Sequence, residues 1–215
     1  MNLRKLSLMI LLILFVSLPL TGCNNNKEQP APSKTGDNAV TQEKTPSAPG
    51  DPEKKRQQKA TVLLQDIEKQ ARQGKVPGCD YAVKTAVLED VLKAWGQPDK
   101  SEYLPAAKGT FVTYSGHGIV LGYNKGMQVF DIRSYDKELN VIGPSDLIRV
   151  YGKAAVTRSF DDQQMIGYVV SDEFRIRFIF PAPTKSEPDP GLDHLAILYP
   201  AGSVNSMADD PGVEW

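Results

Sequence analysis

The chain has 215 residues, enough for one domain of ordinary size plus further segments. It carries 25 Lys and Arg against 26 Asp and Glu, a formal net charge of −1. This balance lacks the basic footprint of nucleic-acid-binding proteins and the polybasic run that anionic lipids attract, so we expect no nucleic-acid partner. The two cysteines, Cys23 and Cys79, are too few for a disulfide framework, and we expect Cys79 to be a small buried apolar residue.

The N-terminus has the layout of an export signal. Residues 1–5 carry Arg4 and Lys5, and residues 6–20 are almost entirely apolar. These 15 residues would form a helix of about 22 Å, because a helix rises ~1.5 Å per residue. That length falls short of the ~30 Å hydrocarbon core of a bilayer, so the segment predicts a secretory leader and not a stable transmembrane helix.

The leader ends in Leu20, Thr21, Gly22 and Cys23, which resemble the lipobox of bacterial lipoproteins. The resemblance implies that the Cys23 thiol takes a diacylglycerol and that a peptidase then removes residues 1–22. Acyl chains such as palmitate would hold the protein on the extracytoplasmic face of the cell membrane. An ordinary cleaved secretory signal and an uncleaved anchor helix remain the alternatives.

A polar segment follows and gives way to a helical pattern. Residues 24–59 contain five prolines and no aromatic residue, so they cannot bury enough apolar surface to offset the entropy of ordering. Helical spacing then appears in five apolar residues: Ala60, Leu63, Leu64, Ile67 and Ala71. We therefore predict a disordered tether over 23–56 and a helix over 57–73.

An internal repeat follows the first helix. The sequence DVLKAWG at 90–96 returns as DLIRVYG at 146–152, with the same order of acidic, aliphatic, basic and aromatic residues. Each copy predicts a short amphipathic helix that ends at a glycine. Thr85 can cap the N-terminus of the first helix, and Pro144 suits the first turn of the second.

Strand-like runs separated by turn residues follow each predicted helix: 110–114, 119–123 and 129–135, then 167–170, 174–180 and 192–199. We therefore predict an α+β fold of two tandem units, each a helix plus a three-stranded antiparallel sheet, over about 84–136 and 143–199. The units share one core within a domain of residues 57–200, preceded by the N-terminal helix and followed by a C-terminal tail of 201–215. In the last strand, two alternating sets could face the core: His194, Ala196 and Leu198, or Leu195, Ile197 and Tyr199.

Three segments of the first unit carry a family resemblance. LKAWGQPD at 92–99, GYNKG at 122–126 and FDIRSY at 130–135 are similar to the YjgB-like family of exported bacillus-type proteins, which carry a domain of unknown function. The helix and three-strand unit also resembles the beta-lactamase-inhibitor-protein and BamE/SmpA architectures, which act by binding proteins. The second unit departs from the pattern, because Ala154 stands in the place of Pro98.

The sequence offers no catalytic or metal-binding constellation. The two histidines, His117 and His194, have no ligand partner at a suitable spacing, so we expect hydrogen-bonded or solvated roles for both. The acidic pairs at 161–162 and 209–210 do not belong to a calcium-binding loop. We therefore expect no catalytic residue, no metal and no cofactor.

One surface stands out as a candidate for binding. If Phe130 and Ile132 face the core, then Asp131, Arg133 and Tyr135 share the opposite face of their strand. Arg and Tyr often anchor protein interfaces, although a solvated sheet face would show the same pattern.

Our leading hypothesis from the sequence is a non-catalytic, membrane-anchored lipoprotein that binds an envelope protein or a cell-wall polymer. The alternatives are an envelope hydrolase with an unrecognised carboxylate site and a carrier of a small ligand. A hydrolase of this kind requires a pocket with two or more carboxyl groups of perturbed pKa.

Overall fold

The computed structural model describes residues 51–215. Its helices are α1 (Pro52–Ala71), α2 (Leu88–Trp95) and α3 (Pro144–Tyr151). Its strands are β1 (Lys100–Leu104), β2 (Gly109–Tyr114), β3 (Ile119–Tyr123), β4 (Val129–Ser134), β5 (Val156–Ser159), β6 (Gln163–Val169), β7 (Arg175–Pro181) and β8 (His194–Leu198).

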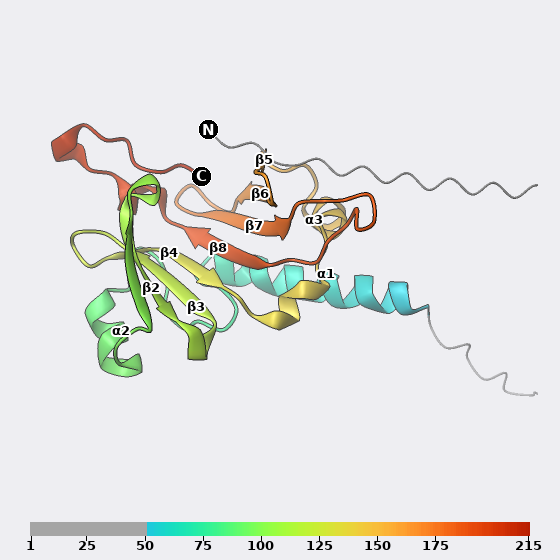
Figure 1. Cartoon of the computed structure of the whole chain (residues 1–215), viewed down its shortest axis with the longest axis horizontal. Helices are drawn as coiled ribbons and strands as arrows, with labels where there is room; N and C mark the ends of the chain where they lie inside the picture. Colours follow the sequence, from blue (N-terminus) through green and yellow to red (C-terminus); the bar gives the residue numbers. More distant parts are fainter. Residues whose placement is uncertain (1–50) are drawn as a thin grey trace, which may run out of the picture. The chain divides into compact units, whose positions relative to one another are not determined.

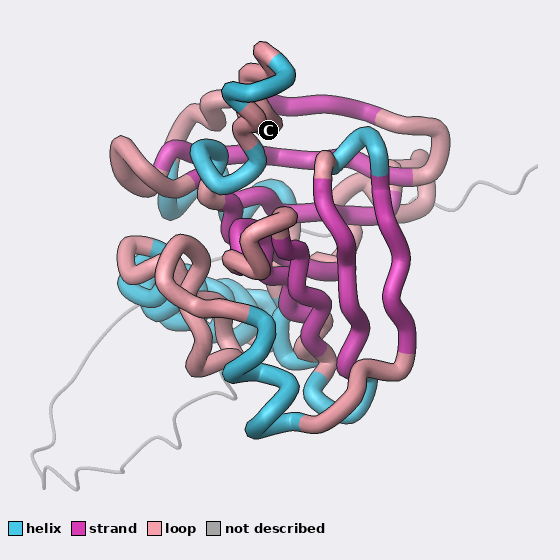
Figure 2. The backbone as a smooth tube through the Cα atoms, turned by 90° about the vertical axis from the view of Figure 1, so that its left-hand side faces the viewer, coloured by secondary structure: helices cyan, strands magenta, loops and turns pink. Residues whose placement is uncertain are grey.

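All these strands belong to one antiparallel sheet with the order β1-β2-β3-β4-β8-β7-β6-β5. The predicted fold of two tandem units with separate three-stranded sheets is therefore wrong. We call α2 and β1–β4 the first half of the fold, and α3 and β5–β8 the second half. The last strand of the first half, β4, pairs with the last strand of the second half, β8, with Ile132 opposite Ile197. Figure 2 shows the strands changing direction between the two halves as the single sheet twists.

Each half also contains a fourth strand that the sequence did not reveal. These strands, β1 and β5, lie at the two edges of the sheet, and nearly all their residues are exposed. An edge strand needs a partner on only one side and can present polar side chains to water on both faces. The sequences KSEYL and VTRS therefore lack the apolar alternation that marks a buried strand.

The main core lies between the helices and one face of the sheet (Figure 1). Helix α1 contributes four buried residues: Ala60, Leu64, Ile67 and Ala71. They belong to the same cluster as Leu88 of α2, Leu147 of α3 and Phe178 of β7. Among the residues described, no helix combines the length and apolar character needed to span a bilayer.

Helix α1 begins at Pro52, five residues before the predicted start at 57. The Asp51 side chain accepts a hydrogen bond from the Glu53 N–H, and the proline occupies the first turn, where its missing N–H is not needed. The early start has a tertiary reason as well, because Arg56 pairs with buried Asp146 of α3 at 2.6 Å. Residues 52–56 of the predicted tether are thus helical, and its residues 23–50 lie outside the described residues.

The repeated segments occupy equivalent positions in the two halves. The glycines after α2 and α3, Gly96 and Gly152, have φ values of 79° and 75°, and each N–H bonds to the last turn of its helix. Their carbonyl oxygens accept hydrogen bonds from the hydroxyls of Tyr114 and Tyr168, at 3.2 and 3.1 Å. Pro144 is the first residue of α3, as predicted. The predicted N-cap by Thr85 is wrong, because Val87 occupies that position.

The opposite face of the sheet, which we call the open face, carries Phe111, Asp131, Arg133, Arg177 and Ala196. The pairing of β3 with β4 shifts register beside Gly122, so that β4 carries one extra residue there, Phe130. Phe130 packs on the open face with Phe111 and Leu198. The expectation that Phe130 faces the main core is therefore wrong.

The C-terminal segment of residues 200–215 covers part of the open face. Val213 packs against the small apolar cluster of that face, and Lys108 forms an ion pair with Asp210. At the end of this segment the Trp215 ring lies against Gly167, where a Cβ would come within 2.7 Å of the indole. The predicted C-terminal tail is therefore a packed part of the fold.

Candidate functional site

A cluster of charged side chains lies at the middle of the open face. Arg133 on β4 and Arg177 on β7 both face Ala196 on β8, which lies between them in the sheet. Both guanidinium groups pair with the carboxylate of Asp131, Arg133 through Nε at 3.2 Å and Arg177 through Nη2. The Asp131 side chain is 1% exposed, whereas those of Arg133 and Arg177 are 23% and 12% exposed.

The electrostatics of the cluster depend on both arginines. Burial alone would raise the pKa of the Asp131 carboxyl group, but the charges and hydrogen bonds of Arg177 and Arg133 outweigh it and lower the pKa. Asp131 is therefore ionised at neutral pH. Two guanidinium groups then share one carboxylate, which leaves a net charge of +1 in the cluster.

Tyr135 extends the same face beyond the end of β4. Its ring stacks on the imidazole of His194 with centroids 4.5 Å apart and planes inclined by 21°. His194 in turn bonds through Nδ1 to the carboxylate of Asp193 at 2.6 Å. Burial lowers the pKa of His194 although Asp193 opposes the shift, so the imidazole is neutral at pH 7. Tyr135 itself remains 39% exposed and can contact a partner.

An aromatic ring supports the cluster from the other side. The guanidinium carbon of Arg133 lies 4.5 Å from the centroid of Phe111 on β2, a cation–π contact. The Phe111 ring can lie there because Gly122 has no side chain, since a Cβ at that position would be 2.6 Å from the ring. Arg133 is thus fixed by an ion pair and by an aromatic surface.

The three sequence-predicted residues Asp131, Arg133 and Tyr135 therefore lie together on one face, but with unequal access to solvent. Sequence reasoning missed their partners Arg177 and His194. The alternation of Arg177 with buried Ile and Phe residues in β7 could have placed this arginine on the face opposite the core. No local pattern could have placed it beside Asp131, which lies 46 residues earlier.

The remaining candidates fall into two groups. Leu20, Thr21, Gly22 and Cys23 lie outside the described residues. Cys79 is buried, as expected, and burial raises the pKa of its thiol to about 11. Within residues 51–215, no group of three or more His, Cys, Asp or Glu side chains could hold a metal ion.

Comparison with known proteins identifies the family. The sequence model of the domain of unknown function DUF4309 matches residues 64–198, so the chain belongs to this family. The crystal structure of a DUF4309 family protein, YjgB from Bacillus subtilis subsp. subtilis str. 168, is similar with a TM-score of 0.50 and 16% identity. The similarity covers 66% of this chain and 99% of that chain. The resemblance to the YjgB-like family is thus confirmed. No curated protein matches the chain.

Proposed function

We propose that this DUF4309 protein is a non-catalytic binding module on the extracytoplasmic face of a cell membrane, and that its open face binds an acidic surface of an envelope protein. The observation that carries the proposal is the cluster of Asp131, Arg133 and Arg177, with Tyr135 exposed at its edge. The partner is a protein and not a wall polymer, because Arg and Tyr side chains of this kind are enriched among the anchors of protein interfaces.

The charge of the cluster favours an acidic partner. Asp131 neutralises only one of the two guanidinium groups, and the Arg133 side chain is the more exposed of the two. A carboxylate of the partner would complete the neutralisation through charge-assisted hydrogen bonds. The two guanidinium groups outweigh the repulsion between the partner's carboxylate and Asp131, because both of them pair with Asp131.

The rigidity of the cluster favours binding as well. Arg133 and Arg177 lie on strands that pair with β8 from its two sides, in the middle of the sheet. The ion pairs and the Phe111 contact restrict the Arg133 side chain before any partner arrives. Less side-chain entropy is therefore lost on association than for a free surface arginine.

The proposed location rests on the N-terminal sequence. Leu20, Thr21, Gly22 and Cys23 match the lipobox residue by residue, and the apolar segment before them is too short to span a bilayer as a helix. Two acyl chains on Cys23 would give firm retention, since each buried methylene contributes ~0.8 kcal/mol. Retention at the membrane raises the local concentration of the module for a partner in the envelope.

The carboxyl groups give the hydrolase alternative no support. A general acid that works near neutral pH needs a carboxyl group of raised pKa. In the part of the chain that the structure describes, every carboxyl group with a shifted pKa is shifted downward: Glu53, Asp99, Asp131, Asp146 and Asp210. We therefore do not propose hydrolysis.

A photo-crosslinking experiment in intact cells tests the proposal. A photoreactive amino acid replaces Tyr135 in the full chain, with the lipid anchor retained. Tyr103 on β1, which is 63% exposed, provides the control position. We expect a discrete crosslinked protein from position 135 and not from position 103, and we expect Arg133→Ala to reduce its yield at least tenfold.

Two results would overturn the proposal. One is the same set of crosslinks from positions 135 and 103, which would show that the open face has no selective partner. The other is a crosslink only to wall polymer, which would replace the protein partner. The anchor is tested separately by Cys23→Ser, which should release the protein or leave its precursor uncleaved.

A further inference from the structure

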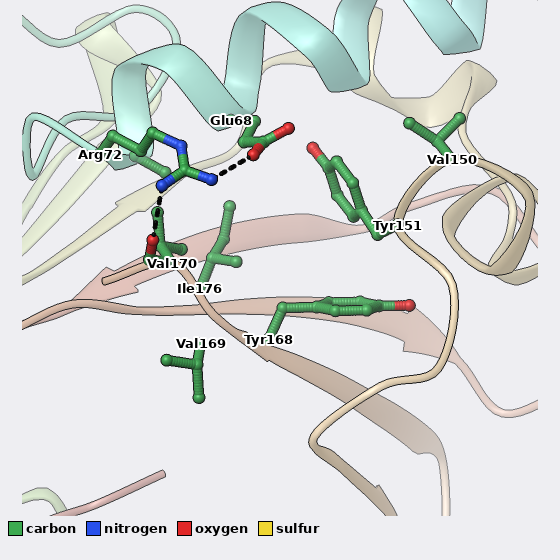
Figure 3. A pocket seen from close by; sticks show the side chains of 9 residues that line it. Glu68, Arg72, Val150, Tyr151, Tyr168, Val169, Val170 and Ile176 are labelled. Atoms are coloured by element: carbon green, nitrogen blue, oxygen red, sulfur yellow. Dashed lines mark hydrogen bonds and ion pairs between the residues drawn. The ribbon is translucent and has the colours of Figure 1, made fainter. Parts of the chain in front are cut away.

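An open cavity of about 250 Å³ lies between α1 and the second half of the sheet (Figure 3). Its walls include the rings of Tyr151 and Tyr168 and the side chain of Ile176. Glu68 of α1 and Arg72, the residue that follows α1, line the cavity on the side of this helix. We propose that the cavity binds a small, planar aromatic molecule whose ring packs against the two tyrosines.

The first half of the fold shows what occupies the equivalent place there. In the second half, Tyr151 and Tyr168 meet edge to face, with centroids 5.3 Å apart and planes inclined by 69°. In the first half, Trp95 and Tyr114 meet in the same way, at 5.2 Å and 77°. The two pairs are held in the same way, because the hydroxyl of each strand tyrosine donates a hydrogen bond to the carbonyl oxygen of the glycine that follows the helix of its half.

In the first half this aromatic pair is covered by further rings. His117 stacks on Trp95 with centroids 4.0 Å apart and planes inclined by 12°. Tyr81 meets the same indole edge to face at 5.1 Å. The protein thus supplies its own planar group to the aromatic pair of this half.

In the second half the buried ring of Phe178 contacts both tyrosines, with centroids 6.0 Å from Tyr151 and 6.3 Å from Tyr168, but no ring stands at the sequence position equivalent to His117. His117 follows Tyr114 by three residues, and the residue three positions after Tyr168 is Ser171. The Ser171 hydroxyl instead accepts hydrogen bonds from the N–H groups of Glu173 and Phe174 at 3.3 and 3.1 Å. The aromatic pair of the second half therefore borders a cavity and has no ring from the loop after Tyr168 to cover it.

Helix α1 forms the remaining wall of the cavity, and its contacts differ between the two halves. It packs on α3, where Arg56 pairs with buried Asp146, whereas the equivalent Asp90 of α2 is exposed and pairs only with Lys93. Near the end of α1, Arg72 bonds to the Val170 carbonyl oxygen at 3.1 Å and pairs with Glu68 at 2.6 Å. These contacts link the end of α1 to the residue after β6, beside the cavity.

The size and the lining define the class of ligand. An apolar cavity of ~150 Å³ can hold benzene, and pockets for drug-sized ligands begin at ~300 Å³. A volume of about 250 Å³ therefore suits one fused pair of rings. The rings of Tyr151 and Tyr168 favour a planar aromatic body, and Glu68 and Arg72 favour a polar substituent at the mouth. This inference does not depend on the proposed role of the open face.

The test uses 2-naphthol as the probe and the full chain with Cys23→Ser, labelled in its Val and Ile methyl groups for NMR. We expect saturable shifts of the Val170 and Ile176 methyl signals, with no shift of Ile119, which pairs with Tyr114 in the first half. An equal concentration of decahydro-2-naphthol, which is saturated and not planar, should displace little of the probe.

Matched variants on α1 locate the binding. Glu68→Trp places an indole at the mouth and removes the ion pair with Arg72, and we expect it to weaken binding at least tenfold. Asp66→Trp is the control, because it removes a similar ion pair, with Lys69, from a residue outside the cavity lining. It should bind 2-naphthol like the parent.

The first half offers the reciprocal variant. His117→Ala removes the stacked ring from Trp95 and should let 2-naphthol shift the Ile119 methyl signal. The proposal is overturned if the parent shows no saturable shift, or if Glu68→Trp binds as tightly as Asp66→Trp. Equal binding of the saturated compound would likewise exclude the planar ligand.

Discussion

Replacement of Asp131 by asparagine tests the charge cluster of the open face directly. The substitution keeps the shape of the side chain but leaves the guanidinium groups of Arg133 and Arg177 without their shared counter-ion. Removing one partner of a buried ion pair costs ~3–5 kcal/mol. Because the arginines are 23% and 12% exposed and asparagine keeps one acceptor oxygen, we expect the lower end of that range, about 3 kcal/mol at pH 7. For a domain of this size the melting temperature should fall by about 6–12 °C.

The pH dependence of the effect follows from the lowered pKa of Asp131. A carboxyl group whose pKa is lower in the folded than in the unfolded chain stabilises the fold above its unfolded pKa of ~3.9. That stabilisation is lost as the pH falls through the lower, folded pKa. The difference between the parent and Asp131→Asn should therefore stay constant from about pH 8 to pH 5 and shrink below pH 4.

Urea unfolding followed by tryptophan fluorescence measures both the loss in free energy of unfolding and its dependence on pH. Asp172→Asn, at an exposed position in the loop before β7, serves as the control and should change the free energy of unfolding by less than about 0.5 kcal/mol. A loss below about 1 kcal/mol for Asp131→Asn would refute the cluster as a coupled unit. A difference that stays undiminished at pH 3 would refute the role of the carboxylate charge.

Three further predictions concern other parts of the chain. Gly96→Ala and Gly152→Ala should each lower the free energy of unfolding by about 1–3 kcal/mol in urea titrations, since both glycines have positive φ with ψ of −158° and −147°, a backbone region almost confined to glycine, although a Cβ would meet nothing within 4 Å. Cys79, whose pKa burial raises to about 11, should resist iodoacetamide at pH 8 until urea unfolds the protein. Cys23→Ser should abolish incorporation of radiolabelled palmitate, and labelling equal to the parent would exclude lipid on this residue.

The sequence predicted the helices and strands in which buried and exposed side chains follow a regular pattern. Strands β2, β3 and β7 alternate or carry dense apolar runs, and their predicted bounds lie within one residue of the structure. The helices α2 and α3 were found because the repeated sequence has an apolar face and a terminal glycine. In these elements, the local pattern and the tertiary environment favour the same structure.

The features that the sequence did not predict depend on distant segments. Strands β1 and β5 form only because a neighbouring strand offers them hydrogen bonds. The pairing of β4 with β8 joins residues more than 60 positions apart, so no local signal could distinguish one sheet from two. The orientation of Phe130 follows from a register shift between β3 and β4, which apolar periodicity does not encode.

The pairing of β4 with β8 explains where the candidate site lies. Asp131 and Arg133 come from the first half of the fold, whereas Arg177 and His194 come from the second. In the first half alone, Asp131 would have a single guanidinium partner, and β4 would lack its pairing with β8. The buried carboxylate between two arginines therefore arises only when the two halves form one sheet. The continuous sheet that overturned the predicted fold is thus the condition for the charged surface that we propose as the binding site.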